Sequence, residues 1–284
     1  MLQIICKYLL ACQVCQRETF TRGANHALTT LGQMSSLTQS HHVRNHCASY
    51  YWSDDVIRSR SVSDVVLSGL VNVPAPPARL LADWDREISL RLGLEPGDVE
   101  ALPLARARMR WPDYRRCVQS ASDWTRKLGL HDVLASSDVA LMACRGARYH
   151  HDGAQYGSTA FCNLFLSEDK GLDLYFPAIG HRIPLTLGTA VIFDTGQPHA
   201  VIQRRNADLH MTDFRVADFP PEHDCTQVFL TWELPIEHVD IGQALQIVFD
   251  IEPSIALRLD NEQIWLNGAP VSVCPISGRF IRNL

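Results

Sequence analysis

Seven short apolar segments between residues 139 and 234 limit what this chain can fold into more than any other feature. They span residues 139–144, 159–166, 172–176, 182–187, 189–193, 199–203 and 226–234. Glycine or proline stands between each segment and the next. Short strands with this punctuation are typical of a β-sandwich or a jelly roll. We therefore expect a mainly β fold of the α+β class, with its core strands within residues 137–234.

Two helices are predicted before these strands. The apolar stripe of the first consists of Leu80, Leu81, Trp84, Ile88 and Leu92. These residues recur at helical spacing, and Gly93 follows as a stop signal. Residues 113–128 carry a second apolar face, and Gly129 ends it. Stripes of this kind pack against a core more often than they bind a cofactor.

The two ends of the chain have a different texture from its middle. Residues 1–77 are rich in serine, threonine, glutamine and histidine, have irregular hydrophobic periodicity and end in a proline-rich linker. Residues 240–284 predict a helix and a small β appendage, because Asn267-Gly268 suits the turn of a two-residue hairpin. We expect a leader and linker over 1–77, helices and β core over 78–239, and the appendage over 240–284.

Cysteines and histidines in the first segment suggest two readings. Cys12-x-x-Cys15 could bind zinc together with His41, His42, His46 and Cys47. The second half of this set lacks the regular spacing of a zinc finger, so a leader or short helices without metal are favoured. The apolar start of the chain lacks a basic residue before it and is interrupted by Lys7, which is not typical of a signal peptide.

A second pattern concerns chemistry. His150-x-Asp152 follows one predicted strand, and His199 opens another. Two imidazoles and one carboxylate form the facial triad that suits non-haem Fe(II) and leaves half of the coordination positions open. Side chains two residues apart on an extended segment point to the same side, so His150 pairs with Asp152 while His151 points away.

At these residues the sequence resembles the Fe(II)/2-oxoglutarate-dependent dioxygenases. The matching positions, in order, are Gly146, Tyr149, His150, Asp152, Leu174-Tyr175-Phe176-Pro177, Gly188, Phe193, His199 and Val201. The resemblance covers roughly residues 137–234. It implies a double-stranded β-helix, which is a jelly-roll, cupin-like barrel buttressed by the preceding helices, with iron near its open end.

The resemblance also implies an activity. Enzymes of this family use Fe(II), 2-oxoglutarate as co-substrate and O2, release succinate and CO2, and usually hydroxylate a C–H bond. His150, Asp152 and His199 would then be the metal ligands and catalytic residues of an oxidoreductase. The metal and co-substrate would perform the difficult chemistry, while the protein places the substrate.

The residue that anchors 2-oxoglutarate departs from the family pattern. The family places a basic residue about ten positions after the second histidine, but that spacing falls here on Leu209 and His210. Arginine suits the role because its fork binds carboxylates bidentately. The candidates are Arg205, which shares strand parity with His199, then Arg215 and Arg204, with Asn163 as a neutral hydrogen-bonding partner. Arg145 and Arg148 flank the motif and are expected to be exposed or to meet an acidic substrate.

Charge and composition restrict the partners. The net charge of -5 and the pI near 6.2 disfavour nucleic acid, despite a basic run with aromatics at residues 106–116. No apolar run reaches the roughly 20 residues that span a bilayer. Nine scattered cysteines do not look like a disulfide framework, which favours a reducing cytoplasm. We expect a small-molecule substrate.

Two alternatives stay open at this point. A cupin-like metalloenzyme would use the same barrel and ligands without 2-oxoglutarate. The absence of an arginine at the family's position after His199 is consistent with this alternative. A non-catalytic metal-binding module is the other alternative, although the intact set of His150, Asp152 and His199 argues against a degenerate site.

Overall fold

The computed structural model describes residues 46–204 and 212–283. The proposed zinc ligands at Cys12, Cys15, His41 and His42 and the candidate Arg205 lie outside these ranges. The described chain is mainly β, with antiparallel sheets and few helices, as the sequence predicted. Within the described ranges, no helix combines the length and the apolar character needed to cross a membrane.

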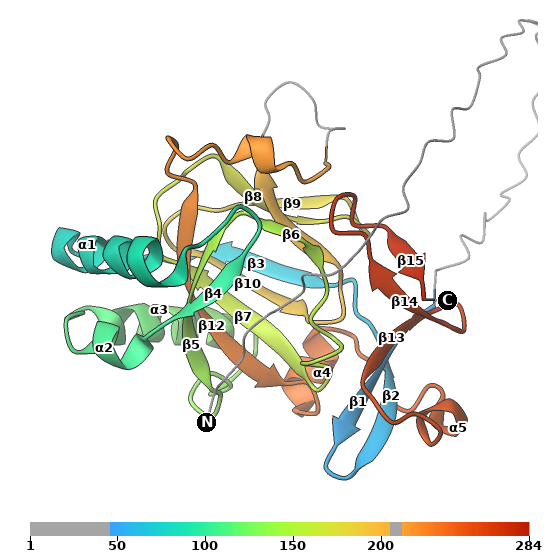
Figure 1. Ribbon diagram of the computed structural model, residues 1–284. Helices are drawn as coiled ribbons and strands as arrows, with labels where there is room; N and C mark the ends of the chain where they lie inside the picture. The colour runs from blue at the N-terminus through green and yellow to red at the C-terminus, as the bar shows by residue number, and fades with distance from the viewer. Residues whose placement is uncertain (1–45, 205–211, 284) are drawn as a thin grey trace, which may run out of the picture. The chain divides into compact units, whose positions relative to one another are not determined.

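The strands and helices follow one another along the chain as in Figure 1. The strands are β1 (Cys47–Ser53), β2 (Val56–Ser61), β3 (Val66–Leu70), β4 (Val99–Leu102), β5 (Val139–Arg145), β6 (Ala147–His150), β7 (Thr159–Phe165), β8 (Leu172–Phe176), β9 (His181–Pro184), β10 (Thr189–Asp194), β11 (His199–Gln203), β12 (Thr226–Pro235), β13 (Gln263–Leu266), β14 (Ala269–Val273) and β15 (Phe280–Arg282). The helices are α1 (Ala78–Glu87), the π-helical turn η1 (Ile88–Leu92), α2 (Leu104–Arg108), α3 (Tyr114–Lys127), the 3-10 turn η2 (Val216–Asp218), α4 (Val239–Ala244) and α5 (Pro253–Ala256).

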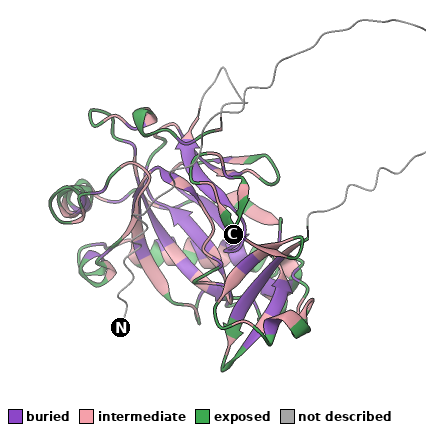
Figure 2. Ribbon diagram, turned by 45° about the vertical axis from the view of Figure 1, so that its right-hand side comes forward, coloured by how far each residue is buried: buried purple, intermediate pink, exposed green. Residues whose placement is uncertain are grey.

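Two antiparallel sheets form the central part of the described chain. The larger has the strand order β3-β10-β7-β12-β5-β4, and the smaller has the order β6-β11-β8-β9. One apolar cluster draws buried side chains from both, including Phe165 and Phe193 of the larger sheet and Leu174 and Phe176 of the smaller. The two sheets therefore share a core, and most residues of β7, β8, β10 and β11 are buried, as the purple central strands of Figure 2 show.

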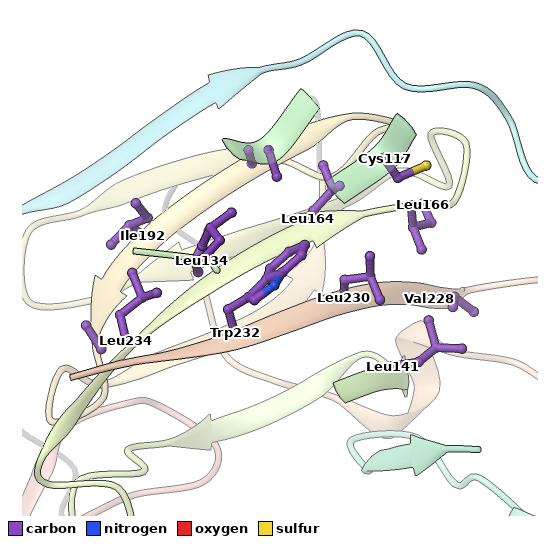
Figure 3. Packing of buried hydrophobic residues seen from close by; sticks show 14 of the residues in the cluster. Cys117, Leu134, Leu141, Leu164, Leu166, Ile192, Val228, Leu230, Trp232 and Leu234 are labelled. Atoms are coloured by element: carbon purple, nitrogen blue, oxygen red, sulfur yellow. The ribbon is translucent and has the colours of Figure 1, made fainter. Parts of the chain in front are cut away.

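The other face of the larger sheet is covered by helices. Trp232 and Leu230 of β12 and Leu164 of β7 pack in one cluster with Cys117 and other apolar residues of α3 (Figure 3). The α1 and α3 helices are confirmed close to their predicted bounds. The glycines that follow them adopt positive φ angles, 57° at Gly93 and 83° at Gly129, which favour glycine and end the helices.

A third, five-stranded sheet joins the two ends of the described chain. Its order is β15-β14-β13-β1-β2, so β1 pairs with β13 although one is N-terminal and the other C-terminal (Figure 1). The hairpin turn is confirmed, because Asn267 and Gly268 both have positive φ. We expected a leader and linker over residues 1–77, but residues 47–70 of this segment contain the strands β1, β2 and β3. The signal is weak there because the buried positions of β1 and β2 include Ser49, Ser59 and Arg60 rather than alternating apolar residues.

Candidate metal centre

The three residues of the predicted triad lie together where the smaller sheet ends. His150 ends β6, and it stands opposite His199, which begins β11, in the antiparallel pairing of these two strands. The Oδ2 atom of Asp152 lies 3.7 Å from Nε2 of His150 and 3.6 Å from Nε2 of His199. One ligand atom from each residue lies within 4.8 Å of the others, so the group could hold a metal ion.

These distances fit a single first-row metal ion. Donor atoms that each lie about 2.1 Å from a shared metal, at angles of about 90° to 120°, are separated by roughly 3.0 to 3.6 Å. The separation of 3.6 Å lies at the upper limit of this range, and that of 3.7 Å lies just above it. Two nitrogen donors and one carboxylate oxygen are also the donor set that non-haem Fe(II) prefers. The residues present therefore fit an iron ion.

The orientation of both histidine rings is set by backbone carbonyls. The Nδ1 atom of His150 lies 2.7 Å from the carbonyl oxygen of Arg148, and Nδ1 of His199 lies 3.0 Å from that of Gln197. A carbonyl oxygen only accepts, so Nδ1 must carry the proton and donate it in each case. The lone pair of Nε2 then points toward Asp152, which is the tautomer that a metal ligand needs.

Burial favours the uncharged forms of these groups. Burial, reinforced by the nearby His150 ring, holds the pKa of His199 well below its usual value, so its imidazole is neutral. Burial raises the pKa of Asp152, while His150 and His151 oppose that rise. A divalent cation between them would offset the cost of the buried carboxylate.

His151 is not part of the triad. The metal-binding group contains His150 rather than its neighbour, in agreement with the alternation of side chains along an extended segment. The Nδ1 atom of His151 is buried and has no hydrogen-bond partner among the residues that the structure describes. Burial lowers the pKa of this ring, and it lies close enough to the backbone of Val271 in β14 to hydrogen-bond with it.

Aromatic rings wall the triad on the side of the shared core. The ring of Phe193 lies edge-on to His199 with 4.7 Å between centroids, and Phe176 lies 6.1 Å from it. Phe161 continues this wall through an edge-on contact with Phe193. Apolar rings at these positions keep water from the buried side of His199. A ligand would therefore approach the triad from its other sides.

The candidate anchors for 2-oxoglutarate are placed very differently. Arg204 is already engaged, because its Nε donates to Asp173 at 2.6 Å and its Nη1 donates to Asp169 at 2.8 Å. Arg215 is exposed just before η2. Arg204 therefore could bind a further carboxylate only by giving up these two ion pairs, and it does not fit the role as it stands.

Asn163 is the candidate that faces the shared core. It lies on β7 between Phe161 and Phe165, and side chains two residues apart share a face of a strand. Its side chain is 7% exposed, and its Oδ1 atom has no partner among the described residues. A buried amide in this position can accept or donate a hydrogen bond to a bound ligand.

The two arginines beside the motif are not free surface groups as expected. Arg145 donates from Nη2 to the carbonyl oxygens of Phe219 and Pro220, and Arg148 donates to Asp98 at 3.1 Å. Both residues are half-buried, and their hydrogen bonds connect β5 and β6 to distant loops. These partners could not be predicted from the sequence, because they lie far away along the chain.

The basic run at residues 106–116 lies on α2 and the start of α3. Arg106 pairs with Glu87 and Arg110 with Asp83, so two of its charges are offset by carboxylates of α1. These four residues line a cleft of about 390 Å³ between the two helices, to which no triad residue contributes. This arrangement agrees with a solvated, ion-paired surface.

Three buried polar residues in or beside the six- and four-stranded sheets were not predicted from the sequence. Gln227 of β12 is fully buried, and neither of its amide atoms has a partner in the described part of the chain. Arg60 and Asp194 form a buried ion pair between the five-stranded sheet and the end of β10. For Gln227 the signal was a polar residue within an apolar strand, whereas nothing in the sequence links Arg60 to Asp194.

Comparisons with known proteins find similar structures but no similar sequence families. No protein-family model matches the chain, and no curated protein matches it. The viral collagen prolyl hydroxylase vCPH from Paramecium bursaria Chlorella virus-1 is similar over 60% of this chain and 89% of its own, with 9% identity and a TM-score of 0.36. A prolyl-4-hydroxylase from Pseudomonas putida is similar over 60% and 92% of the two chains, with 17% identity and a TM-score of 0.32. The α-ketoglutarate-dependent epimerase SnoN from nogalamycin biosynthesis is similar over 60% and 78%, with 11% identity and a TM-score of 0.32.

Proposed function

We propose that this chain is a non-haem Fe(II)- and 2-oxoglutarate-dependent oxygenase that hydroxylates a C–H bond of a small molecule and releases succinate and CO2. The observation that carries the proposal is the triad. His150, Asp152 and His199 come from separate segments, yet their donor atoms converge at distances that suit one metal ion. Both rings present the nitrogen that a metal requires.

The order of the strands supports the finer fold that we propose, a double-stranded β-helix. From β5 to β12, the strands β5, β7, β10 and β12 belong to the larger sheet, while β6, β8, β9 and β11 belong to the smaller. A chain that passes between two facing antiparallel sheets in this way winds a jelly roll. His150 and His199 then lie at the end of the barrel where β6 stops and β11 starts.

Each side chain of the site has a distinct task in this proposal. His150 and His199 offer neutral nitrogens, and Asp152 offers the negative charge that retains a divalent ion. Bound Fe(II) would supply the reaction with dioxygen that an unactivated C–H bond requires. The rings of Phe176 and Phe193 exclude water beside His199, which protects a reactive site from side reactions.

The proposal gives 2-oxoglutarate one neutral and one basic contact. Asn163 suits the neutral contact, because its buried amide faces the shared core and its oxygen has no partner among the described residues. Arg215 and Arg205 are the basic residues that we propose for the distal carboxylate. Arg204 is less suited to this role, because Asp169 and Asp173 already pair with it.

A second candidate function is a cupin-like metalloenzyme that does not use 2-oxoglutarate. The observation that favours it is that the unpartnered amides facing the shared core, in the described part of the chain, carry no positive charge. Asn163 and Gln227 are buried amides, and the ion-paired Arg204 offers no free cation. A dicarboxylate normally requires a basic partner when it is buried.

The experiment that tests the proposal is an anaerobic titration with Fe(II) and then with 2-oxoglutarate. The weak visible charge-transfer band of the iron chelate should appear in the wild type and be absent in His199→Ala. His181→Ala is the matched control, since His181 is an exposed histidine of the same small sheet. Tight iron binding without the band would favour the second candidate. Absence of iron binding in the wild type would refute both candidate functions as iron enzymes.

A further inference from the structure

Two loops carry the triad, and they are bonded to each other. The loop between β6 and β7 holds Asp152, and the turn between β10 and β11 leads into His199. The backbone N–H of Asp152 donates to the carbonyl oxygen of Thr195 at 2.8 Å. The hydroxyl of Thr195 lies 2.7 Å from the carbonyl oxygen of Tyr156 and 2.8 Å from that of Thr159, and it shares its single proton between them. The position of Asp152 relative to His199 therefore depends on where the Thr195 turn lies.

Asp194 fixes that turn from within the protein. Its side chain is fully buried, and its carboxylate accepts hydrogen bonds from the backbone N–H groups of Gly196 and Ser63, each at 2.8 Å. One of these donors belongs to the turn before His199, and the other belongs to the segment after β2. A carboxylate that accepts from two backbone groups holds both segments in one geometry.

Arg60 of β2 completes the connection. It is also fully buried, and its guanidinium binds both oxygens of Asp194, at 2.6 Å from Nη1 and 2.9 Å from Nη2. Its Nε donates to the carbonyl oxygen of Gly157, at 2.9 Å, in the loop that carries Asp152. One planar side chain thus reaches the loop of Asp152 and, through Asp194, the turn of His199.

Close packing of the two loops adds to this connection. A Cβ atom on Gly153 would lie 2.9 Å from the Cα of Gly196 and 2.6 Å from Cδ1 of Ile264. The loops therefore touch each other and also rest on β13, which belongs to the same five-stranded sheet as β2. That sheet contacts both metal-bearing loops at Arg60 and at Ile264.

We infer that Arg60 is a positioning residue for the metal site, acting through Asp194 and Gly157 to hold Asp152 and His199 at coordinating distance. The five-stranded sheet would then help to position the metal ligands, rather than being a separate appendage. The inference rests on the proposed function, because it assigns a role toward the metal ion of that function. A fork of five donors suits this role, since a lysine ammonium cannot bind both Asp194 oxygens and Gly157 in one plane.

The test is a titration with Co(II), which reports the metal geometry through its visible ligand-field bands and needs no turnover. The main variant combines Arg60→Met with Asp194→Leu, because an apolar pair of similar volume replaces a buried ion pair without leaving a lone charge. Partners that orient metal ligands typically change metal affinity by 10- to 100-fold. We expect the double variant to stay folded without metal, at a lower unfolding temperature because backbone groups of Gly157, Gly196 and Ser63 lose their partners. It should bind Co(II) about 10- to 100-fold more weakly and show shifted bands.

Arg58→Met is the matched control. Arg58 lies on the same strand and binds Glu237 and Asp250, neither of which belongs to the metal-bearing loops. Its Co(II) affinity and bands should equal those of the wild type. If the double variant is unfolded, Arg60→Lys takes its place, since it keeps the charge opposite Asp194 and loses the fork, and we expect weaker Co(II) binding there too.

The outcomes separate this inference from the proposed function. Wild-type Co(II) affinity and bands in the folded double variant, or in Arg60→Lys when that variant is used, would overturn the role of Arg60 and leave the metal site standing. A wild type that binds no Co(II) would overturn the proposed function and this inference with it. Weaker binding with shifted bands in the Arg60 variants, but not in Arg58→Met, would establish the positioning role.

Discussion

The helix-covered face of the larger sheet and the five-stranded sheet are held in place in different ways. On the helix-covered face, the contacts are almost entirely apolar, with Trp232 and Leu230 buried under α3. The apolar cluster of the five-stranded sheet has four buried members, Ala48, Tyr50, Ile57 and Ala256. Its attachment instead relies on directed bonds, among them Arg60 to Asp194 and the Tyr51 hydroxyl to Glu237 at 3.0 Å.

This difference matters for the site because the two kinds of contact constrain geometry differently. Apolar burial is non-directional and grows with the area removed from water, so it stabilises the two sheets without specifying the last few tenths of an ångström. Ion pairs and hydrogen bonds have preferred distances and angles. The loops that carry Asp152 and His199 are held by such directed bonds, from Arg60 to Gly157 and from Gly196 to Asp194. Changes in the two regions should therefore have separable effects on stability and metal binding.

The largest loss of stability is expected from Asp194→Ala. The substitution leaves the fully buried guanidinium of Arg60 without its carboxylate and removes the acceptor of Gly196 and Ser63. Removing one partner of a buried ion pair typically costs about 3 to 5 kcal/mol. We expect a decrease of that size in the free energy of unfolding, measured by urea denaturation without metal.

The control for this change is the paired substitution of both residues. Arg60→Met with Asp194→Leu should recover part of the lost stability, because no charge is left buried alone, although Gly196 and Ser63 still lack their acceptor. The opposite outcome is an Asp194→Ala variant whose free energy of unfolding equals that of the wild type. That result would show that the five-stranded sheet is not held by this pair.

A core substitution on the helix-covered face should give a similar loss of stability with no effect on the site. Leu230 is fully buried between β12 and the helices, and Leu→Ala in such a core costs about 2 to 5 kcal/mol. We expect urea unfolding to report this loss while the Co(II) affinity of the folded variant stays at the wild-type value. Weakened Co(II) binding in Leu230→Ala would contradict the separation of the two regions.

The sequence predicted what is local and periodic. The strands between Val139 and Leu234 were visible from their apolar runs, and the hairpin was visible from Asn267-Gly268, because these signals depend on neighbouring residues. The convergence of the triad followed from a resemblance in order and spacing. It now has a structural cause, the pairing of His150 opposite His199.

What the sequence could not predict depends on contacts between distant segments. Arg60 and Asp194 are 134 positions apart, and an arginine in a serine-rich strand is normally a surface residue. The same holds for Arg204, a candidate anchor by sequence that two aspartates occupy. Strand parity identifies the face of a side chain, but it carries no information about which partner that face will meet.

Metal binding should stabilise the protein through the polar loops. A ligand that binds only the folded state at 100 times its Kd contributes about 2.7 kcal/mol. We expect Co(II) at that excess to raise the unfolding temperature of the wild type and of Leu230→Ala by comparable free energies. His199→Ala should show no such shift, because it lacks one of the three donors. An equal shift in His199→Ala would mean that the ion binds elsewhere.

The smallest effect is expected from Glu233, a carboxyl group of β12. Its neighbours Trp232 and Leu234 pack in the helix-covered cluster, so alternation places Glu233 on the other face of the strand. Burial, with a smaller contribution from Asp138, raises the pKa of Glu233. A folded-state pKa above the unfolded value means that ionised Glu233 costs stability at high pH. This cost fades as the pH falls through the raised pKa, and it is absent below the unfolded value of about 4.3. Glu233→Gln should therefore be more stable than the wild type at pH 7.5, and the difference should shrink at pH 4.5. Urea unfolding at both pH values measures it, with the exposed Glu168→Gln as control. A difference that stays constant between the two pH values would show that Glu233 gains or loses stability through packing rather than through its charge.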